Sequence, residues 1–158
     1  MTQQLFYINE VVSFAIEREK EAFALYEKLA EITTEPKLQK VFHNLMHQEK
    51  KHQDFYQHML EHLKPKQTPT VHRTDEYAAY MQELISSART VKPDLDKITA
   101  NMDDAIVFAK AREQDSIIFY VNLKNFIDPR GHDKIDTIIA EEARHLAILT
   151  KLQQDLRH

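Results

Sequence analysis

Six residues of this sequence have the types and spacing needed to bind metal ions. They are Glu19, Glu49, His52, Glu113, Glu142 and His145, which we call the six polar core residues. Each lies in a series of apolar residues that recur every three or four positions, the side that a helix buries in a bundle. A buried carboxylate without a partner costs several kcal/mol or takes up a proton. Four of them in one core therefore indicate bound cations.

The spacing within two of the series narrows the kind of site. In Glu49-x-x-His52 and Glu142-x-x-His145 the two ligand types lie three positions apart, so one helical turn can offer both to the same ion. Four carboxylates and two neutral imidazoles balance the charge of two divalent cations. The chain has no Cys, which excludes disulfides, iron–sulfur clusters and thiolate ligands. Oxygen and nitrogen ligands suit two iron ions, with manganese or zinc as alternatives.

Four helices are needed to position these residues. The apolar series run over residues 5–29, 38–63, 102–127 and 135–156. Short connections around Pro36 and around Asp128-Pro129-Arg130-Gly131 make each pair an antiparallel hairpin. Between the pairs, residues 64–100 predict a long crossover with a short helix of its own at Glu76–Ala88, because a long loop without structure is uncommon in a compact domain. The sequence thus predicts an all-α four-helix bundle of two hairpins.

The two predicted hairpins repeat one plan. Glu113 follows Glu19 by 94 residues, and Glu142-x-x-His145 follows Glu49-x-x-His52 by 93. The four glutamates also lie at similar distances along their helices from the two short turns, at about 1.5 Å per residue. We therefore expect the four carboxylates to meet at one level of a pseudo-twofold bundle.

The composition limits the other functions. The 158 residues fit a single domain over 1–158, and one Gly favours helices over sheets. A net charge of −4 gives no basic field for nucleic acid. The first residues lack the pattern of a signal peptide and no stretch is apolar enough to span a membrane, so we expect a soluble cytoplasmic protein without membrane partners.

Other polar residues carry less specific signals. His43, His47, His58 and His62 form pairs four positions apart, which is more typical of a solvated helix face than of a metal site. Glu141 precedes Glu142 by one position, and neighbouring helix positions diverge by about 100°. We therefore expect Glu141 to lie outside the ligand set.

At these residues the sequence resembles the rubrerythrin branch of the ferritin-like superfamily, and most of all its short, stand-alone members. The resemblance covers nearly the whole chain, and two Glu-x-x-His motifs, each preceded by a core Glu, make it specific. This ligand set is the one of ferritin-like di-iron and di-manganese proteins. The resemblance implies that Glu49 and Glu142 bridge the ions, and that Glu19 and Glu113 are terminal ligands.

The resemblance also implies that His52 and His145 each bind one ion. Tyr26 and Tyr120 would donate hydrogen bonds to ligand carboxylates. Ordinary core aromatics whose hydroxyls find some other partner are the alternative interpretation of these two tyrosines.

Two departures from rubrerythrins proper stand out. Lys110 replaces a further Glu that those proteins carry one turn before the terminal ligand of the third helix. The chain also has no Cys, and so lacks the rubredoxin-type module that holds iron with four cysteines.

The implied function is that of a di-iron oxidoreductase that reduces hydrogen peroxide or dioxygen with an external electron donor. Ferroxidase or iron-handling activity and a non-catalytic metal-binding bundle are the alternatives, so the sequence leaves open whether the protein is an enzyme. An oxygenase would additionally need an apolar cavity beside the metals. We predict no catalytic residues beyond the ligands, and a homodimer is plausible for this fold.

Overall fold

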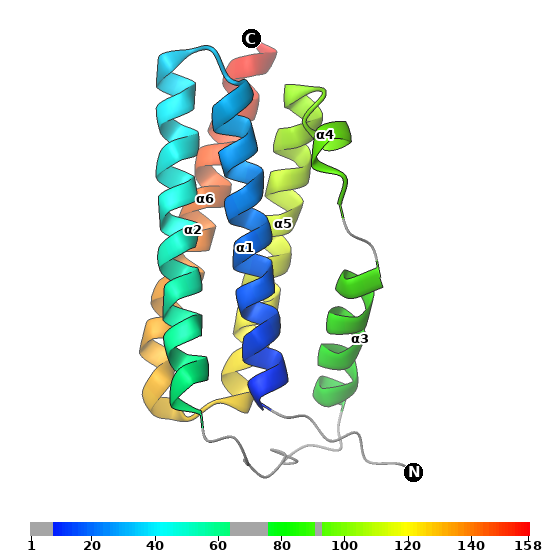
Figure 1. Cartoon of the computed structure of the whole chain (residues 1–158), viewed down its shortest axis with the longest axis vertical. Helices are drawn as coiled ribbons and strands as arrows, with labels where there is room; N and C mark the ends of the chain where they lie inside the picture. The colour runs from blue at the N-terminus through cyan, green and yellow to red at the C-terminus, as the bar shows by residue number, and fades with distance from the viewer. Residues whose placement is uncertain (1–7, 64–75, 91–92) are drawn as a thin grey trace.

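The computed structural model describes residues 8–63, 76–90 and 93–158. Four long helices form an antiparallel bundle (Figure 1). They are α1 (Ile8–Ile32), α2 (Pro36–His62), α5 (Met102–Leu123) and α6 (His132–Arg157). Helix α1 packs along α2, and α5 packs along α6, so the two predicted hairpins are confirmed. No helix of the described residues is long and apolar enough to cross a membrane.

Local sequence explains where these helices begin and end. Pro36 starts α2 because its fixed φ suits a first helical turn. Asn101 caps α5, since its side-chain oxygen accepts a hydrogen bond from the Asp104 amide at 3.2 Å. The α5–α6 connection is longer than the sequence predicts. Helix α5 ends at Leu123, and two 3₁₀ turns, η1 (Lys124–Phe126) and η2 (Pro129–Gly131), lead into α6.

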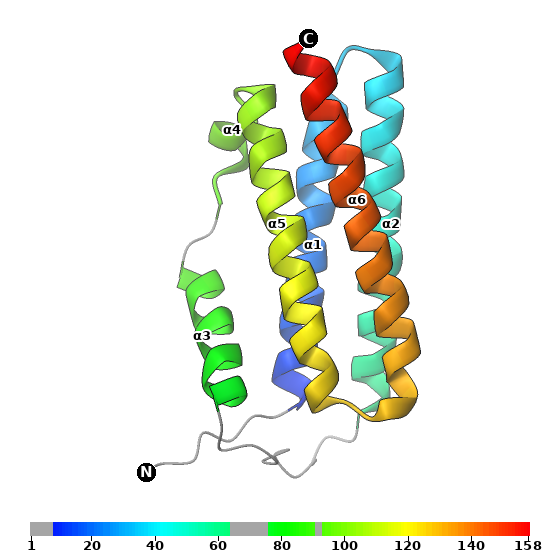
Figure 2. The same cartoon turned by 180° about the vertical axis from the view of Figure 1, so that it is seen from behind.

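The crossover contains two helices where the sequence predicts one. Helix α3 (Glu76–Thr90) is the predicted element, and α4 (Leu95–Ile98) adds a single turn that Asp94 caps. Met81 and Ile85 of α3 are buried in the bundle's core. Figure 2 shows α3 lying along one half of the bundle, next to α5. Residues 64–75 of the predicted crossover and Leu5 of the first apolar series lie outside the described residues.

The core consists of two apolar clusters. The first lies at the end that holds the α5–α6 turn and includes Val12, Phe119 and Ile135. The second lies at the end that holds the α1–α2 turn and includes Leu29 and Phe42. The six polar core residues fall between the two clusters along all four helices, so the fold places one polar layer in an otherwise apolar interior.

Two neighbouring residues of α5 offer a test of this packing. Ile106 is fully buried in the second cluster, whereas the side chain of Val107 is 48% exposed. Ile106→Ala is expected to lower the free energy of unfolding by about 2–5 kcal/mol, because it leaves a cavity. Val107→Ala should change it by less than about 0.5 kcal/mol. Urea unfolding followed by circular dichroism measures both, and equal effects would contradict this placement of α5.

Candidate metal centre

The polar layer is assembled from all four long helices. Helix α1 supplies Glu19, α2 supplies Glu49 and His52, α5 supplies Glu113, and α6 supplies Glu142 and His145. None of the six is more than 3% exposed. The structure therefore buries at one level every residue that the sequence singles out as a ligand.

The six side chains form two overlapping sets. Glu19, Glu49, His52 and Glu142, which we call the His52 group, have ligand atoms that all lie within 4.8 Å of one another. The same holds for Glu49, Glu113, Glu142 and His145, the His145 group. Glu49 and Glu142 belong to both groups. Two such sets with two shared carboxylates are the arrangement that a pair of ions with bridging carboxylates requires.

The carboxylates carry unmet bonding capacity. One buried oxygen each of Glu19, Glu49 and Glu142, the Oε2 atom, has no hydrogen-bond partner. Unpartnered buried anionic oxygens are costly, and a cation compensates them better than a neutral donor. The donor set of carboxylate oxygens and imidazole nitrogens also suits divalent metals. The residues present therefore fit a metal pair.

The histidines contact the carboxylates across the two hairpins. His52 Nδ1 of α2 lies 3.0 Å from Glu142 Oε1 of α6, and His145 Nδ1 of α6 lies 2.9 Å from Glu49 Oε1 of α2. The rings stack with centroids 5.9 Å apart and an interplanar angle of 19°. Both Nδ1 atoms thus face the carboxylates, which makes Nδ1 the ligand atom that each ring offers.

The two tyrosines also hydrogen-bond across the hairpins. The Tyr26 hydroxyl of α1 donates to Glu113 Oε1 of α5, and the Tyr120 hydroxyl of α5 donates to Glu19 Oε1 of α1. Burial, together with the charges of Glu113 and Glu19, raises the pKa of these hydroxyls well above the usual value. Both tyrosines therefore stay protonated donors. They orient the two carboxylates that belong to only one group each.

Burial and neighbouring charges shift the pKa values of the groups in the polar layer. Burial and the charges of Glu19 and Glu142 raise the pKa of Glu49 well above its usual value. Burial and Glu19 likewise raise the pKa of Glu142 to about 8. The pKa of His145 is also raised, but its bound proton makes the ring positively charged, whereas a bound proton makes a carboxylate neutral. Burial disfavours this positive charge, but hydrogen bonds to Glu113, Glu142 and Glu49 raise the pKa of His145 to about 12.

The outer nitrogens of the two rings have partners that the sequence analysis did not identify. His52 Nε2 lies 2.5 Å from Glu141 Oε2, and His145 Nε2 lies 2.5 Å from Gln48 Oε1. Glu141 belongs to neither ligand group, as its helix position predicts, yet it contacts a ring from the other hairpin. The available signal was the repeat itself, because Gln48 and Glu141 precede the two Glu-x-x-His motifs at equivalent positions.

Two further residues bear on the layer. Tyr56, which the sequence analysis did not single out, is fully buried, and its ring stacks on Tyr120 with centroids 5.1 Å apart. Lys110, at the position where rubrerythrins proper carry a further Glu, donates to Gln153 Oε1 of α6 at 3.0 Å. Lys110 thus takes no place in either ligand group.

The remaining histidines of α2 form no comparable set. His43, His47, His58 and His62 are exposed. The rings of His58 and His62 are 4.1 Å apart, but His62 Nδ1 lies 2.8 Å from the His58 carbonyl oxygen of its own helix. Within the described parts of the chain, only the His52 and His145 groups bring three or more ligand side chains together.

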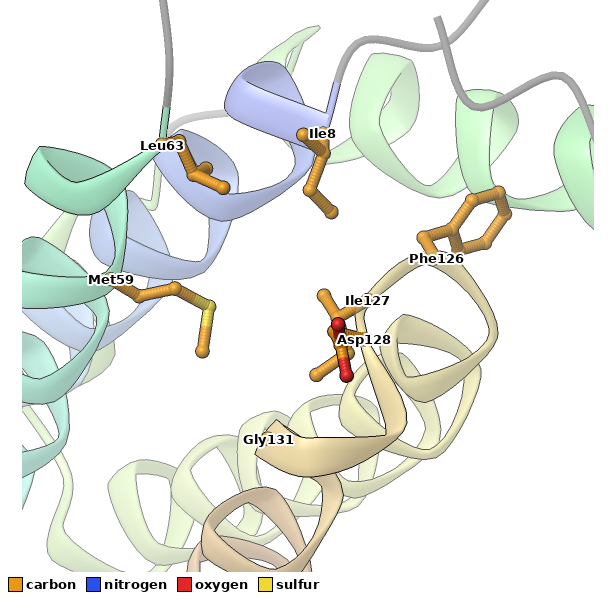
Figure 3. A pocket seen from close by; sticks show the side chains of 7 residues that line it. All are labelled: Ile8, Met59, Leu63, Phe126, Ile127, Asp128 and Gly131. Carbon is orange, nitrogen blue, oxygen red and sulfur yellow. The ribbon is translucent and has the colours of Figure 1, made fainter. Parts of the chain in front are cut away.

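An apolar cavity of about 320 Å³ lies at the end of the bundle (Figure 3). Ile8, Met59 and Leu63 face Ile127 across it. Met59 is seven residues beyond His52, or about 10 Å along the helix. This cavity therefore does not adjoin the polar layer, where an oxygenase would need it.

A smaller pocket reaches the layer from the surface. It has a volume of about 240 Å³ and lies between α2 and α6. His52 and Glu141 line its inner part, and Lys51 and Lys134 are among the residues at its wall. His52 and Glu141 both line this pocket, so both connect the layer with the surface there.

An antiparallel four-helix bundle with paired carboxylates and histidines at its centre defines the ferritin-like class of di-metal carboxylate proteins. The sequence profile of the rubrerythrin family matches residues 10–153, and the chain belongs to that family. The predicted family and fold are both confirmed.

Two solved structures share the fold over 97% of this chain. One is a Thermotoga maritima protein assigned to the ferritin-like diiron-carboxylate class, with a TM-score of 0.74, 20% identity and 98% of its own chain covered. The other is CopM in its Cu(II)-bound form, with a TM-score of 0.69, 13% identity and 99% covered. A search among curated proteins found no match.

The raised pKa values predict how stability depends on pH. Folded Glu142 keeps its proton up to a pH of about 8, whereas an unfolded Glu releases it near 4.5. The folded state therefore binds more protons between these values, and the free energy of unfolding falls as the pH rises, by about 1.4 kcal/mol per unit for each such proton. His145, with its pKa raised to about 12, adds the same sign above pH 6.5.

Thermal unfolding of chelator-treated protein from pH 5.5 to 8.5 measures this effect. The melting temperature should fall across the range. With saturating Mn(II) the fall should shrink or reverse, because ligand carboxylates are deprotonated when they bind metal. A melting temperature of metal-free protein that rises with pH would contradict the protonated layer.

Proposed function

We propose that this protein binds two iron ions in the polar layer and reduces hydrogen peroxide or dioxygen with electrons from an external donor. The observation that carries the proposal is the pair of overlapping groups, with Glu49 and Glu142 common to both and unpartnered oxygens on three carboxylates. Family membership and the likeness to a ferritin-like diiron-carboxylate protein support it.

Each side chain then has a distinct role. Glu49 and Glu142, which belong to both groups, would be shared by the two ions, Glu19 and Glu113 would each hold one ion, and His52 and His145 would offer Nδ1. When bound, two ferrous ions supply the two electrons that reduction of one peroxide molecule to water consumes.

The chain's own residues set the conditions for this chemistry. The apolar clusters on both sides exclude bulk water from the layer. Tyr26 and Tyr120 fix the terminal carboxylates through their hydroxyl protons. The pocket at Glu141 offers a small oxidant a path to the layer. Because the chain has no Cys, it carries no second iron site of the rubredoxin type, and a separate reductant must restore the ferrous state.

Two other functions fit the same geometry. Ferroxidase activity uses the same ligands and differs in the fate of the oxidised iron. A non-catalytic bundle would hold a redox-inert ion such as zinc. Elemental analysis of protein purified from its own host separates the redox-inert bundle from the two iron-dependent functions, and copper belongs in that analysis because CopM was solved with Cu(II). Release of ferric iron after oxidation then separates ferroxidase activity from peroxide reduction.

A pair of variants on α2 tests the proposal. Glu49 is fully buried in both groups, whereas Glu61 is exposed on the same helix. Glu49→Ala should bind fewer than two ions per chain, because it removes a carboxylate common to both groups, and circular dichroism checks that the variant is folded. Glu61→Ala should bind two.

Stopped-flow mixing with peroxide then follows oxidation of the anaerobically loaded ferrous protein. Wild type and Glu61→Ala should oxidise far faster than free ferrous ion, and Glu49→Ala should lose most of this advantage. Two bound ions in Glu49→Ala would refute the site. Slow oxidation by a wild type that holds two ferrous ions would refute the peroxide reaction and leave the site intact.

A further inference from the structure

The two histidines of the polar layer have chemically different outer partners. Each ring presents Nδ1 to the carboxylates and Nε2 to one acceptor beyond the layer. The acceptor is the Glu141 carboxylate for His52 and the Gln48 amide oxygen for His145, at 2.5 Å in both cases. The two acceptors occupy equivalent positions of the internal repeat. The two hairpins therefore have the same ligand types but different partners for the outer histidine nitrogen.

The difference between a carboxylate and an amide as outer partner changes how strongly each histidine would bind an ion. A hydrogen bond from Nε2–H to a carboxylate withdraws the proton more strongly than one to a neutral amide, and so makes Nδ1 a stronger donor. The carboxylate also brings one more negative charge to the His52 side. Both effects favour a cation in the His52 group over one in the His145 group.

Nearby cations do not cancel this advantage. Lys51 and Lys134 line the same pocket, but both are solvent-exposed, so water and salt screen their charges. Lys134 Nζ also lies over the Phe55 ring, 6.0 Å from its centroid. Glu141 by contrast contacts the His52 ring directly, and its side chain is 32% exposed, so water still solvates its charge.

We propose that Glu141 and Gln48 make the two metal positions unequal, so that the His52 group binds its ion more tightly and fills first. The inference rests on the proposed function, because it presupposes two ions in the polar layer. It adds two positioning residues, which touch the ligand rings and not the ions, and an order of filling.

Variants that keep one group at a time isolate the two positions. Glu113→Ala leaves the His52 group complete, and Glu19→Ala leaves the His145 group complete. In anaerobic titrations of the full chain with Co(II), followed by calorimetry and visible absorbance, Glu113→Ala should bind one ion about tenfold more tightly than Glu19→Ala. Second-layer partners are typically worth 10–100-fold in affinity.

Exchanging the outer partners provides the decisive comparison. Glu141→Gln should weaken Co(II) binding about tenfold in the Glu113→Ala background and leave the Glu19→Ala background unchanged. Gln48→Glu should tighten binding about tenfold in the Glu19→Ala background only. Glu61→Gln and Gln57→Glu make the same charge changes elsewhere on α2 and should have little effect in either background.

The outcomes separate the inference from the proposed function. A wild type that binds fewer than two Co(II) ions would refute the function itself. Two ions with no selective effect of Glu141→Gln or Gln48→Glu would overturn only the inequality. If a single-group variant does not fold, the first and second Co(II) binding constants are measured instead, in chains that carry only Glu141→Gln or only Gln48→Glu. Glu141→Gln should then weaken the first step and Gln48→Glu should strengthen the second, and the reverse would overturn the order.

Discussion

Burying four carboxylates at one level of a helical bundle is the constraint on which this structure depends. The cost of removing their charges from water is met unequally. Hydrogen bonds outweigh burial and lower the pKa of Glu19 and Glu113, whereas burial raises the pKa of Glu49 and Glu142. The constraint also fixes the helices along their axes. Sliding one helix by a residue would turn its Glu by about 100° toward an apolar cluster. The polar layer thus specifies the bundle's register at the expense of its stability.

The two hairpins complete each other through this layer. The shortest contacts that reach a ligand candidate from another helix cross from one hairpin to the other, from Tyr26 to Glu113, for example, or from His145 to Glu49. Neither hairpin alone holds a full ligand group, because each group draws on both. The internal repeat in the sequence reflects these reciprocal contacts between the hairpins. Equivalent residues on the two hairpins perform equivalent tasks for the partner hairpin.

Sequence alone predicts the fold and the composition of the layer well, since both follow from one kind of signal. A Glu or His on an apolar helix face conflicts with burial, and six such conflicts at matched spacing are resolved together when the helices share bound cations. The start of α2 at Pro36 follows from equally local chemistry. The end of α5 at Leu123 does not, because the apolar series continues into the 3₁₀ turn, where Phe126 is still buried.

Gln48 and Glu141 show where this kind of reasoning stops. Helical geometry places Glu141 outside the ligand set, and the sequence analysis does not consider Gln48. That geometry describes one helix at a time and does not predict contact with a ring from the facing helix. The role of Tyr56 is missed for a similar reason, because its stacking on Tyr120 depends on how α2 and α5 pack. Contacts between elements that are not neighbours in sequence are the part that periodicity cannot supply.

The departures from symmetry lie mostly outside the six polar core residues. The ligand types match between the halves, whereas the outer partners differ, as Glu141 differs from Gln48 and as Tyr56 corresponds to the apolar Leu149 of the other half. The matched inner set gives each group three carboxylates and one imidazole. A substitution among the outer residues can then alter the surroundings of one ligand group and leave the other group unchanged. If the layer holds two ions as proposed, properties that distinguish one ion from its neighbour would come from the surrounding residues, where a single substitution leaves all six polar core residues in place.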